Sequence, residues 1–227
     1  MYKEFFSLLK RNRSNESIVI DATVGAGKTV YMEMLSEELG IPCFREPVED
    51  NPLLDRFYHD RKRYSFPLQV FFLNRRFEML KKAARLGKPT IMDRSIYGDM
   101  IFAKLLYEEG NMEKDEFILY RDLLKNMLDH VAAPKLMVYL QIDTDSAIER
   151  IKKRGRDYEQ IVERDYWENL NREYEAYFSE YNLSPLLVID AAKYDIVESQ
   201  EDRMEILKIV SRKLAEVNSL SDLTAGR

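Results

Sequence analysis

Residues 17–40 constrain the fold of this chain more than any other stretch. Residues 18–20 (Ile-Val-Ile) form a β-branched run, which is typical of a strand buried on both faces. Residues 25–29 then read Gly-Ala-Gly-Lys-Thr, and residues 31–39 repeat apolar side chains at helical spacing before a glycine stop. A strand, a glycine loop, a Lys-Thr pair and a helix in this order predict a phosphate-binding loop.

Such a loop binds phosphate through successive backbone N–H groups and the N-terminus of the following helix. Lys28 is expected to reach the terminal phosphates, and the Thr29 hydroxyl to ligate Mg²⁺. The full pattern has glycine at its first position, where this chain has Ala22, and an alanine forced to positive φ costs about 1 kcal/mol. An ordinary glycine-rich turn is the alternative, but the flanking strand and helix favour a nucleotide site. The expected ATP-binding residues of the loop are Thr23, Val24, Gly25, Ala26, Gly27, Lys28 and Thr29.

Composition describes a globular protein of 227 residues, 45% apolar and 33% charged. A net charge of −5 argues against nucleic acid as a main partner, because phosphate backbones select basic surfaces. Cys43 is the only cysteine, so an internal disulfide is excluded, and a free thiol fits a cytoplasmic location. The apolar run at residues 5–9 is too short for a signal peptide or a membrane span.

Strand and helix patterns alternate along the rest of the chain. This alternation predicts an α/β fold, a five-stranded parallel sheet wrapped by helices with P-loop kinase architecture. One domain is expected at residues 17–218, after an N-terminal amphipathic helix and linker at 1–16 and before a flexible tail at 219–227. The expected strands are residues 18–20, 42–45, 89–93, 135–142 and 186–190, and the expected later helices are 51–60, 65–86, 96–109, 113–131, 144–153, 164–181 and 200–217.

Polar side chains stand where two of these strands end and along one helix. Glu46 follows the second expected strand and Asp93 ends the third, at the edge where open α/β sheets bind ligands. Gln69 and Arg76 are two helical turns apart and share a face. Each residue alone also suits a solvated surface.

A basic cluster covers residues 150–156, with five positive charges in seven residues. A solvated basic turn is one interpretation. Because a phosphate loop lies elsewhere in the chain, a lid at residues 150–160 that closes on phosphates is the better one. Its expected phosphate ligands are Arg150, Arg154 and Arg156.

An ordered set of short motifs now resembles one family, the deoxynucleoside kinases, and most of all bacterial deoxyadenosine/deoxyguanosine kinases and their deoxycytidine kinase relatives. The resemblance covers about residues 17–217. Each motif is weak alone, and the set in this order is specific. The motifs are Glu46-Pro47-Val48, Asn51-Pro52, Phe57-Tyr58, Gln69 with Arg76, Asp93-Arg94-Ser95 with Tyr97 and Asp99, and Arg154-Gly155-Arg156 with Glu159-Gln160.

The resemblance implies a role for each matched residue. Glu46 matches the general base for the nucleoside 5′-hydroxyl. Arg94 matches the arginine that holds this carboxylate and the reacting phosphate. Asp93 matches a carboxylate associated with Mg²⁺ beside Thr29, while Lys28 and Arg154 neutralise the moving phosphoryl group. For the sugar, Tyr58 and Glu159 match the pair that hydrogen-bonds the 3′-hydroxyl. For the base, Gln69 and Asp99 match the residues that read its edge, and Arg76 matches the residue that orients Asp99. Phe102 matches a ring that stacks on the base.

The implied function is ATP- and Mg²⁺-dependent phosphorylation of the 5′-hydroxyl of a deoxynucleoside, a step of nucleoside salvage. Deoxyadenosine is the first choice, followed by deoxyguanosine or deoxycytidine. The family also implies a homodimer, with a heterodimer as the alternative, and residues 190–195 near the adenine of ATP. The chain departs from the family at Ala22 and at Gly98, where relatives often carry a larger side chain.

Two other functions remain open. A nucleoside monophosphate kinase shares the loop and the arginine lid but needs a basic acceptor pocket, whereas the matched acceptor residues here are mixed in charge. A subunit that binds nucleotide without turnover is suggested only by Ala22.

Overall fold

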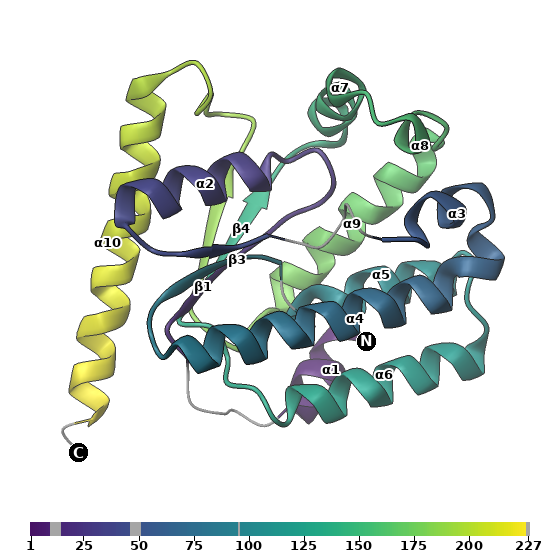
Figure 1. Cartoon of the computed structure of the whole chain (residues 1–227), viewed down its shortest axis with the longest axis horizontal. Helices are drawn as coiled ribbons and strands as arrows, with labels where there is room; N and C mark the ends of the chain where they lie inside the picture. The colour runs from purple at the N-terminus through teal and green to yellow at the C-terminus, as the bar shows by residue number, and fades with distance from the viewer. Residues whose placement is uncertain (10–14, 46–50, 95, 226–227) are drawn as a thin grey trace.

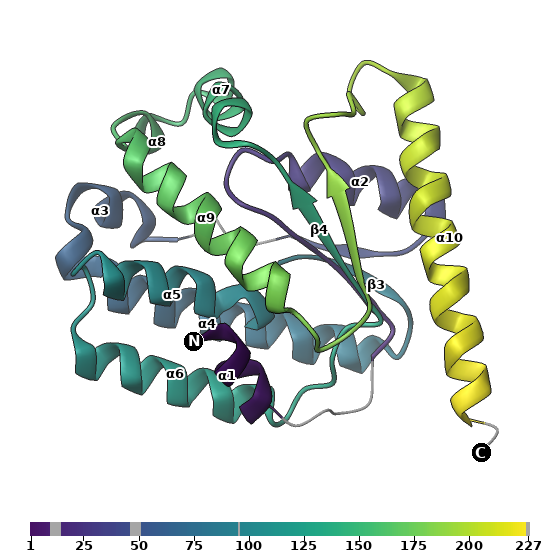
Figure 2. The same ribbon diagram turned by 180° about the vertical axis from the view of Figure 1, so that it is seen from behind.

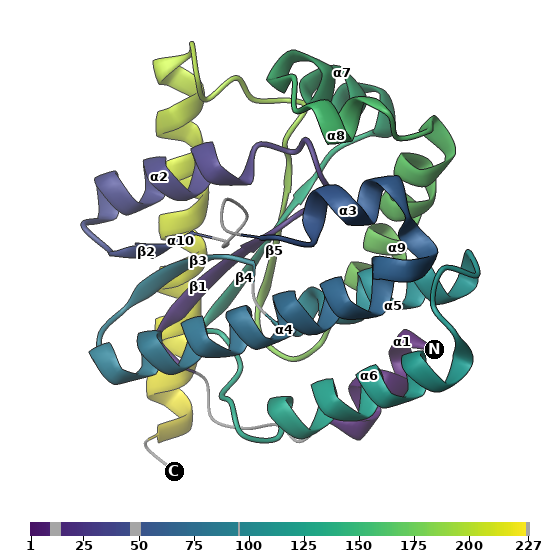
Figure 3. The same cartoon turned by 45° about the vertical axis from the view of Figure 1, so that its right-hand side comes forward.

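The computed structural model describes residues 1–9, 15–45, 51–94 and 96–225. Within these residues the strands form one parallel sheet of five, in the order β2-β3-β1-β4-β5 (Figures 1 and 3). The predicted fold class is confirmed. Because β1 lies between β3 and β4, the phosphate loop leaves the middle of the sheet. The strands are β1 (Ser17–Asp21), β2 (Cys43–Phe44), β3 (Thr90–Asp93), β4 (Leu136–Gln141) and β5 (Leu186–Asp190).

Helices cover both faces of the sheet (Figures 1 and 2). On one side, Ile18 and Ile20 of β1 pack in an apolar cluster with residues of α2 and α10. On the other side, Val19 packs in a second cluster with residues of α4, α5 and α9. This alternation follows from the period of two along a strand. The helices are α1 (Tyr2–Leu8), α2 (Lys28–Leu39), α3 (Leu54–His59), α4 (Arg61–Leu86), the 3₁₀ turn η1 (Ile96–Gly98), α5 (Asp99–Glu108), α6 (Lys114–Leu128), α7 (Thr144–Arg154), α8 (Asp157–Gln160), α9 (Arg164–Glu180) and α10 (Gln200–Ala225).

Helix α4 begins earlier than the sequence predicts. Its N-cap is Asp60, whose side chain accepts a hydrogen bond from the backbone N–H of Arg63 at 3.1 Å. The expected start at residue 65 is therefore wrong, because the aspartate cap precedes it. Pro67 lies in the second turn rather than the first, where it removes one backbone donor from the helix.

The last helix is longer than predicted. α10 continues to Ala225, through most of the segment 219–227 that the sequence predicts as a flexible tail. No glycine or proline interrupts residues 200–225, so nothing in the chain itself stops the helix at 217. At the other end, α1 packs on α9, with the ring centroids of Phe6 and Tyr177 5.0 Å apart.

None of the helices in the described part of the chain combines the length and the apolar character needed to cross a bilayer.

Candidate active site

The phosphate loop connects β1 to α2 at the carboxyl edge of the sheet. Gly25 and Gly27 have φ angles of 89° and 87°, a conformation that side chains disfavour. A Cβ atom on Gly25 would also lie 2.5 Å from the carbonyl oxygen of Ala147 on α7. Gly27 is the N-cap of α2, so Lys28 and Thr29 occupy its first turn, where backbone N–H groups carry partial positive charge. The loop thus has the backbone that phosphate binding requires.

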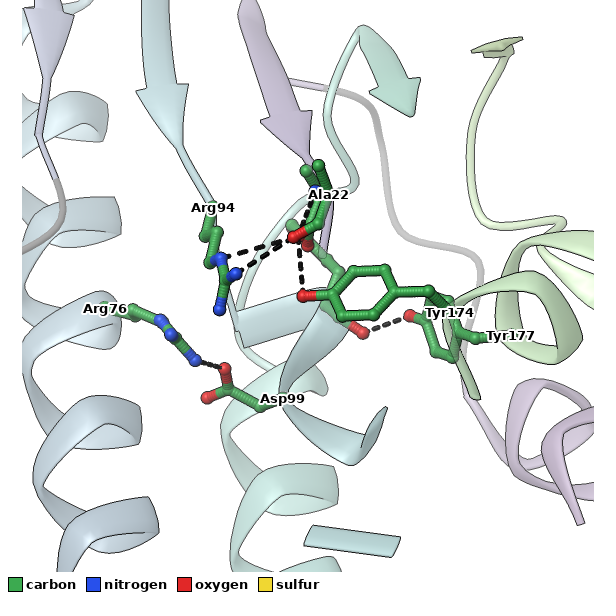
Figure 4. Close-up of polar contacts among 8 residues, drawn as sticks. Ala22, Arg76, Arg94, Asp99, Tyr174 and Tyr177 are labelled. Carbon is green, nitrogen blue, oxygen red and sulfur yellow. Dashed lines mark hydrogen bonds and ion pairs between the residues drawn. The ribbon is translucent and has the colours of Figure 1, made fainter. Parts of the chain in front are cut away.

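Ala22 fits the first position of the loop without strain. Arg94 is the one non-glycine residue with positive φ in the described part of the chain, so Ala22 avoids the left-handed penalty. Ala22 is fully buried, and its carbonyl oxygen accepts a hydrogen bond from Arg94 Nη2 at 2.9 Å (Figure 4). The backbone penalty on which the non-catalytic alternative depended is therefore absent.

Arg94 follows β3 directly and has a φ of 59°. Its backbone N–H donates to the carbonyl of Ile20 at 2.9 Å, which ties this unusual turn to β1. Its guanidinium carbon lies 4.9 Å from the ring centroid of Phe102 on α5. The Arg94 side chain is thus held between the end of β1 and α5. Figure 4 shows its hydrogen bond to Ala22 at the end of β1.

One cavity, which we call the inner cavity, brings together the phosphate loop, α3, α4, α5, α8 and α9. Most residues predicted to bind the nucleoside line it, on apolar and aromatic walls that suit a small organic ligand. Its lining residues are Val24, Lys28, Leu54, Phe57, Tyr58, Leu68, Gln69, Phe72, Arg76, Arg94, Phe102, Arg154, Arg156, Glu159 and Tyr166.

Gln69 and Arg76 both line the inner cavity from α4, as expected from their spacing. Gln69 is 3% exposed, and its Oε1 has no hydrogen-bond partner among the described residues. A buried acceptor without a partner costs about 1–3 kcal/mol. A donor on a ligand in this cavity would remove that cost.

Arg76 forms a buried ion pair with Asp99 at the start of α5 (Figure 4). Asp99 is fully buried and lies outside the described lining of the cavity, whereas Arg76 is part of that lining. Tyr120 of α6 lies close by, and burial, followed by the charge of Asp99, raises the pKa of the Tyr120 phenol. The structure therefore places Arg76 toward the cavity and Asp99 behind it.

Tyr58 and Glu159 line the same cavity from α3 and α8. The Tyr58 ring stacks on Tyr158 of α8, with centroids 5.3 Å apart, which joins the two short helices. Burial, followed by the neighbouring Tyr166 and Glu159, raises the pKa of Tyr58. Its phenol therefore stays protonated and able to donate a hydrogen bond.

The predicted lid arginines take two different positions. Arg154 and Arg156 line the inner cavity and pair with Glu159, at N–O distances of 2.6 and 3.5 Å. Arg150 instead donates to the carbonyl of Ala26 in the phosphate loop at 3.3 Å and to that of Ala191, after β5, at 2.9 Å. It joins the loop to the last strand of the sheet.

A second cavity, the outer cavity, lies on the other side of the phosphate loop. Gly25 and Gly27 line it, as do Arg150 and residues 192–195, within the segment predicted to lie near the adenine of ATP. Tyr31 also lines it, and burial raises the pKa of its phenol to about 12. Arg154 lines both cavities, so the two meet at the lid.

The predicted Mg²⁺ ligands lie on the phosphate-loop side. Asp93 is 6% exposed at the carboxyl end of β3, in register with Ile20 of β1, and Thr29 is in the first turn of α2. Both supply the hard oxygen atoms that Mg²⁺ prefers. The predicted general base Glu46 lies outside the described residues, so its position remains a prediction.

Two residues in or next to the site were not predicted from the sequence. Tyr166 of α9 has no predicted role in the site, but it lines the inner cavity. Asp21 was not singled out, yet its carboxylate lies 3.7 Å from Arg94 Nε. The same pattern that predicted Asp93, a carboxylate at the end of a buried strand, also applies to Asp21.

Comparison with known proteins gives matches over most of the chain. Residues 18–216 match the family model described as deoxynucleoside kinase. The chain is similar to a deoxyguanosine kinase of Lactobacillus acidophilus, with 40% identity over 89% of this chain and 92% of that protein. It is also similar to a deoxyadenosine kinase of the same organism, with 37% identity over 89% and 98% of the two chains. A solved structure of deoxyadenosine kinase from M. mycoides, with the products dCMP and dCDP bound, superposes with a TM-score of 0.78 and 34% identity over 86% of this chain and 99% of that one.

Proposed function

The chain belongs to the deoxynucleoside kinase family, a family of phosphotransferases, and we propose that it transfers the terminal phosphoryl group of ATP to the 5′-hydroxyl of a deoxynucleoside. The observation that carries this proposal is the meeting of two cavities at the lid. Arg154 lines both, Lys28 lines the inner one, and the loop glycines line the outer one. ATP bound in the outer cavity and a deoxynucleoside bound in the inner one would present their reacting atoms to the same positively charged side chains.

The outer cavity is proposed to hold ATP. Its wall contains the phosphate loop and Arg150, which suits an anion with several phosphate groups. Thr29 and Asp93 would hold Mg²⁺, which would supply charge neutralisation on the phosphates. The described residues contain no group of three His, Cys, Asp or Glu side chains placed to bind a metal. A magnesium site built from few protein ligands and the phosphates themselves is consistent with that.

The residues of the chain position the reactants and place positive charge, which is most of what phosphoryl transfer needs from a protein. Lys28, Arg94 and Arg154 would surround the phosphoryl group between the two cavities. Glu46, as predicted from the sequence, would accept the proton of the 5′-hydroxyl, a contribution of typically 10²–10⁴-fold.

The inner cavity is proposed to hold the deoxynucleoside. Tyr58 and Glu159 offer a donor and an acceptor for the 3′-hydroxyl, and Phe102 offers a ring for the base. Gln69 Oε1, which has no hydrogen-bond partner among the described residues, calls for a donor, and the exocyclic amino groups of adenine, guanine and cytosine can each supply one. Deoxyadenosine is the first choice from the family resemblance, ahead of deoxyguanosine and deoxycytidine.

A substrate panel tests this function. Purified protein is incubated with Mg-ATP and each of the four common deoxynucleosides, and the monophosphates are separated by chromatography. We expect monophosphate from deoxyadenosine, with the highest kcat/KM of the four. Absence of product from all four would end the proposal, and a preference for another base would overturn only the choice of deoxyadenosine.

We also propose a cytoplasmic homodimer. The single free cysteine supports a reducing compartment, and the family resemblance supports the homodimer. Leu119, 59% exposed on α6, is the side chain that we expect to lie in the dimer contact. Sedimentation analysis of the wild type and Leu119→Lys tests the dimer. A monomeric wild type would overturn it.

A further inference from the structure

Residue 98 has no room for a side chain, although its backbone conformation does not require glycine. Its φ and ψ angles of −87° and −3° lie in the right-handed helical region, which any residue adopts. A Cβ atom at this position would nevertheless overlap the Oδ2 atom of Asp21, which comes from the end of β1. The carboxylate of Asp21 thus occupies the volume that a side chain on residue 98 would fill.

Asp21 is held there by several contacts and is 1% exposed. Its Oδ1 accepts hydrogen bonds from the backbone N–H of Ala22 at 2.8 Å and from the phenol of Tyr174 at 3.2 Å. The same oxygen lies 3.7 Å from Arg94 Nε. Burying a carboxylate is costly unless charges and hydrogen bonds compensate it, so this placement needs a reason.

Arg94 supplies that reason. Residues 21 and 22 hold its guanidinium from a single strand end, Ala22 through a hydrogen bond to its carbonyl and Asp21 through an ion pair. A guanidinium has five N–H donors in a rigid plane, so two anchors on one side aim the remaining ones. Arg94 and Lys28 both line the inner cavity, where their like charges repel, and both charges interact favourably with the Asp21 carboxylate. The carboxylate offsets this repulsion and fixes the direction of Arg94.

We propose that Asp21 is a positioning residue for phosphoryl transfer, which holds Arg94 at the junction of the phosphate loop and the inner cavity, and that Gly98 is the partner that makes room for it. The proposal rests on the proposed function and deepens it. Asp21 does not touch the reactants; it acts through Arg94. Its loss should therefore lower turnover much more than it changes the affinity for the deoxynucleoside.

The test compares the wild type with Asp21→Asn, Asp21→Ala and the double variant Asp21→Ala/Gly98→Asp. The double variant returns a carboxylate to nearly the same volume from the other chain segment. Glu173→Gln is the matched control, because Glu173 is also a buried carboxylate, 6% exposed, but is bound to Tyr2 and Lys104 and is not part of the inner-cavity lining. We measure kcat and KM for deoxyadenosine, nucleoside affinity by calorimetry, folding by circular dichroism, and the crystal structures of wild type and Asp21→Asn.

We expect Asp21→Asn to lower kcat by about 10- to 100-fold, with KM and calorimetric affinity within about threefold of the wild type. The double variant should recover at least about tenfold over Asp21→Ala, and Glu173→Gln should keep the wild-type kcat. A kcat for Asp21→Asn equal to that of Glu173→Gln, or no recovery in the double variant, overturns the proposal.

Folding failure also decides the question. If Asp21→Asn does not fold but the double variant folds and turns over substrate, the carboxylate is needed at this place and the proposal holds. If neither folds, Asp21 is part of the fold alone and the proposal is wrong. The crystal structures separate this inference from the proposed function, because Arg94 should leave the Ala22 carbonyl in Asp21→Asn even in a protein without kinase activity. An unmoved Arg94 overturns the inference.

Discussion

The guanidinium of Arg154 donates to the carboxylate of Glu159, with Nη2 and Oε2 2.6 Å apart, so the lid residue proposed to bind phosphate and the cavity residue proposed to bind the sugar share one ion pair. Glu159 is 4% exposed, and Arg156 lies 3.5 Å from its other oxygen. The two sites therefore cannot be altered independently at this carboxylate.

Glu159→Gln should weaken both sugar recognition and the lid. An amide keeps the shape but loses the charge that pairs with the arginines, and charge-assisted hydrogen bonds are the stronger ones. We expect kcat/KM for deoxyadenosine to fall at least about tenfold, and the preference for deoxyadenosine over 2′,3′-dideoxyadenosine to shrink. Steady-state kinetics with both nucleosides measure this. Glu168→Gln, an exposed carboxylate paired with Arg164, is the control and should change neither value. An unaltered preference in Glu159→Gln would remove the contact with the 3′-hydroxyl.

Gln69→Leu should stabilise the protein and impair it as an enzyme. Leucine removes a buried oxygen that lacks a partner in the described structure, so we expect the free energy of unfolding to rise by about 1 kcal/mol. The kcat/KM for deoxyadenosine should fall by about 10- to 100-fold, because a donor on the base loses its acceptor. Urea unfolding and steady-state kinetics measure the two effects. Asn74→Leu, on the exposed side of α4, should leave kcat/KM unchanged. A less stable variant with normal kcat/KM would contradict both parts.

Tyr31 should make the fold sensitive to alkaline pH. Burial raises the pKa of its phenol from 10.0 to about 12, so the folded state keeps a proton that the unfolded chain releases. The resulting stability is fully present below pH 10 and is lost as the pH rises through about 12, by at most about 2.7 kcal/mol. Urea unfolding of the wild type and Tyr31→Phe across this range measures it, since other tyrosines cancel in the difference. A difference in unfolding free energy that stays constant from pH 10 to 12 would show that the phenol titrates as in the unfolded chain.

Glu46→Gln tests a residue whose position is known only from the sequence. If Glu46 accepts the proton of the 5′-hydroxyl, the amide should lower kcat at least about 10²-fold, with little change in nucleoside affinity. Rapid-quench kinetics and calorimetry measure the two quantities. Glu38→Gln, on the exposed face of α2, is the control. Near-normal turnover in Glu46→Gln would assign the proton to another acceptor.

Local patterns were read correctly where neighbours in the chain create the structure. The β-branched run of β1, the loop glycines and the helical repeat of α2 each depend on residues a few positions apart, and all are confirmed. Element boundaries were less accurate. α4 and α10 both exceed their predicted limits, because a cap or the absence of a breaker outweighs the apolar pattern there.

Residue order alone was enough to predict the family, the parallel sheet and the backbone of the phosphate loop, because these depend on the succession of elements and on short-range backbone geometry. The packing of distant segments decided which side of the Arg76–Asp99 pair faces the cavity, and which buried carboxylate holds Arg94. Asp21 and Gly98 are far apart in the chain, and only the folded sheet and helices bring a strand end and a helix start into the same few ångströms. Burial and charge pairing belong to that assembled interior, so no local pattern contains them.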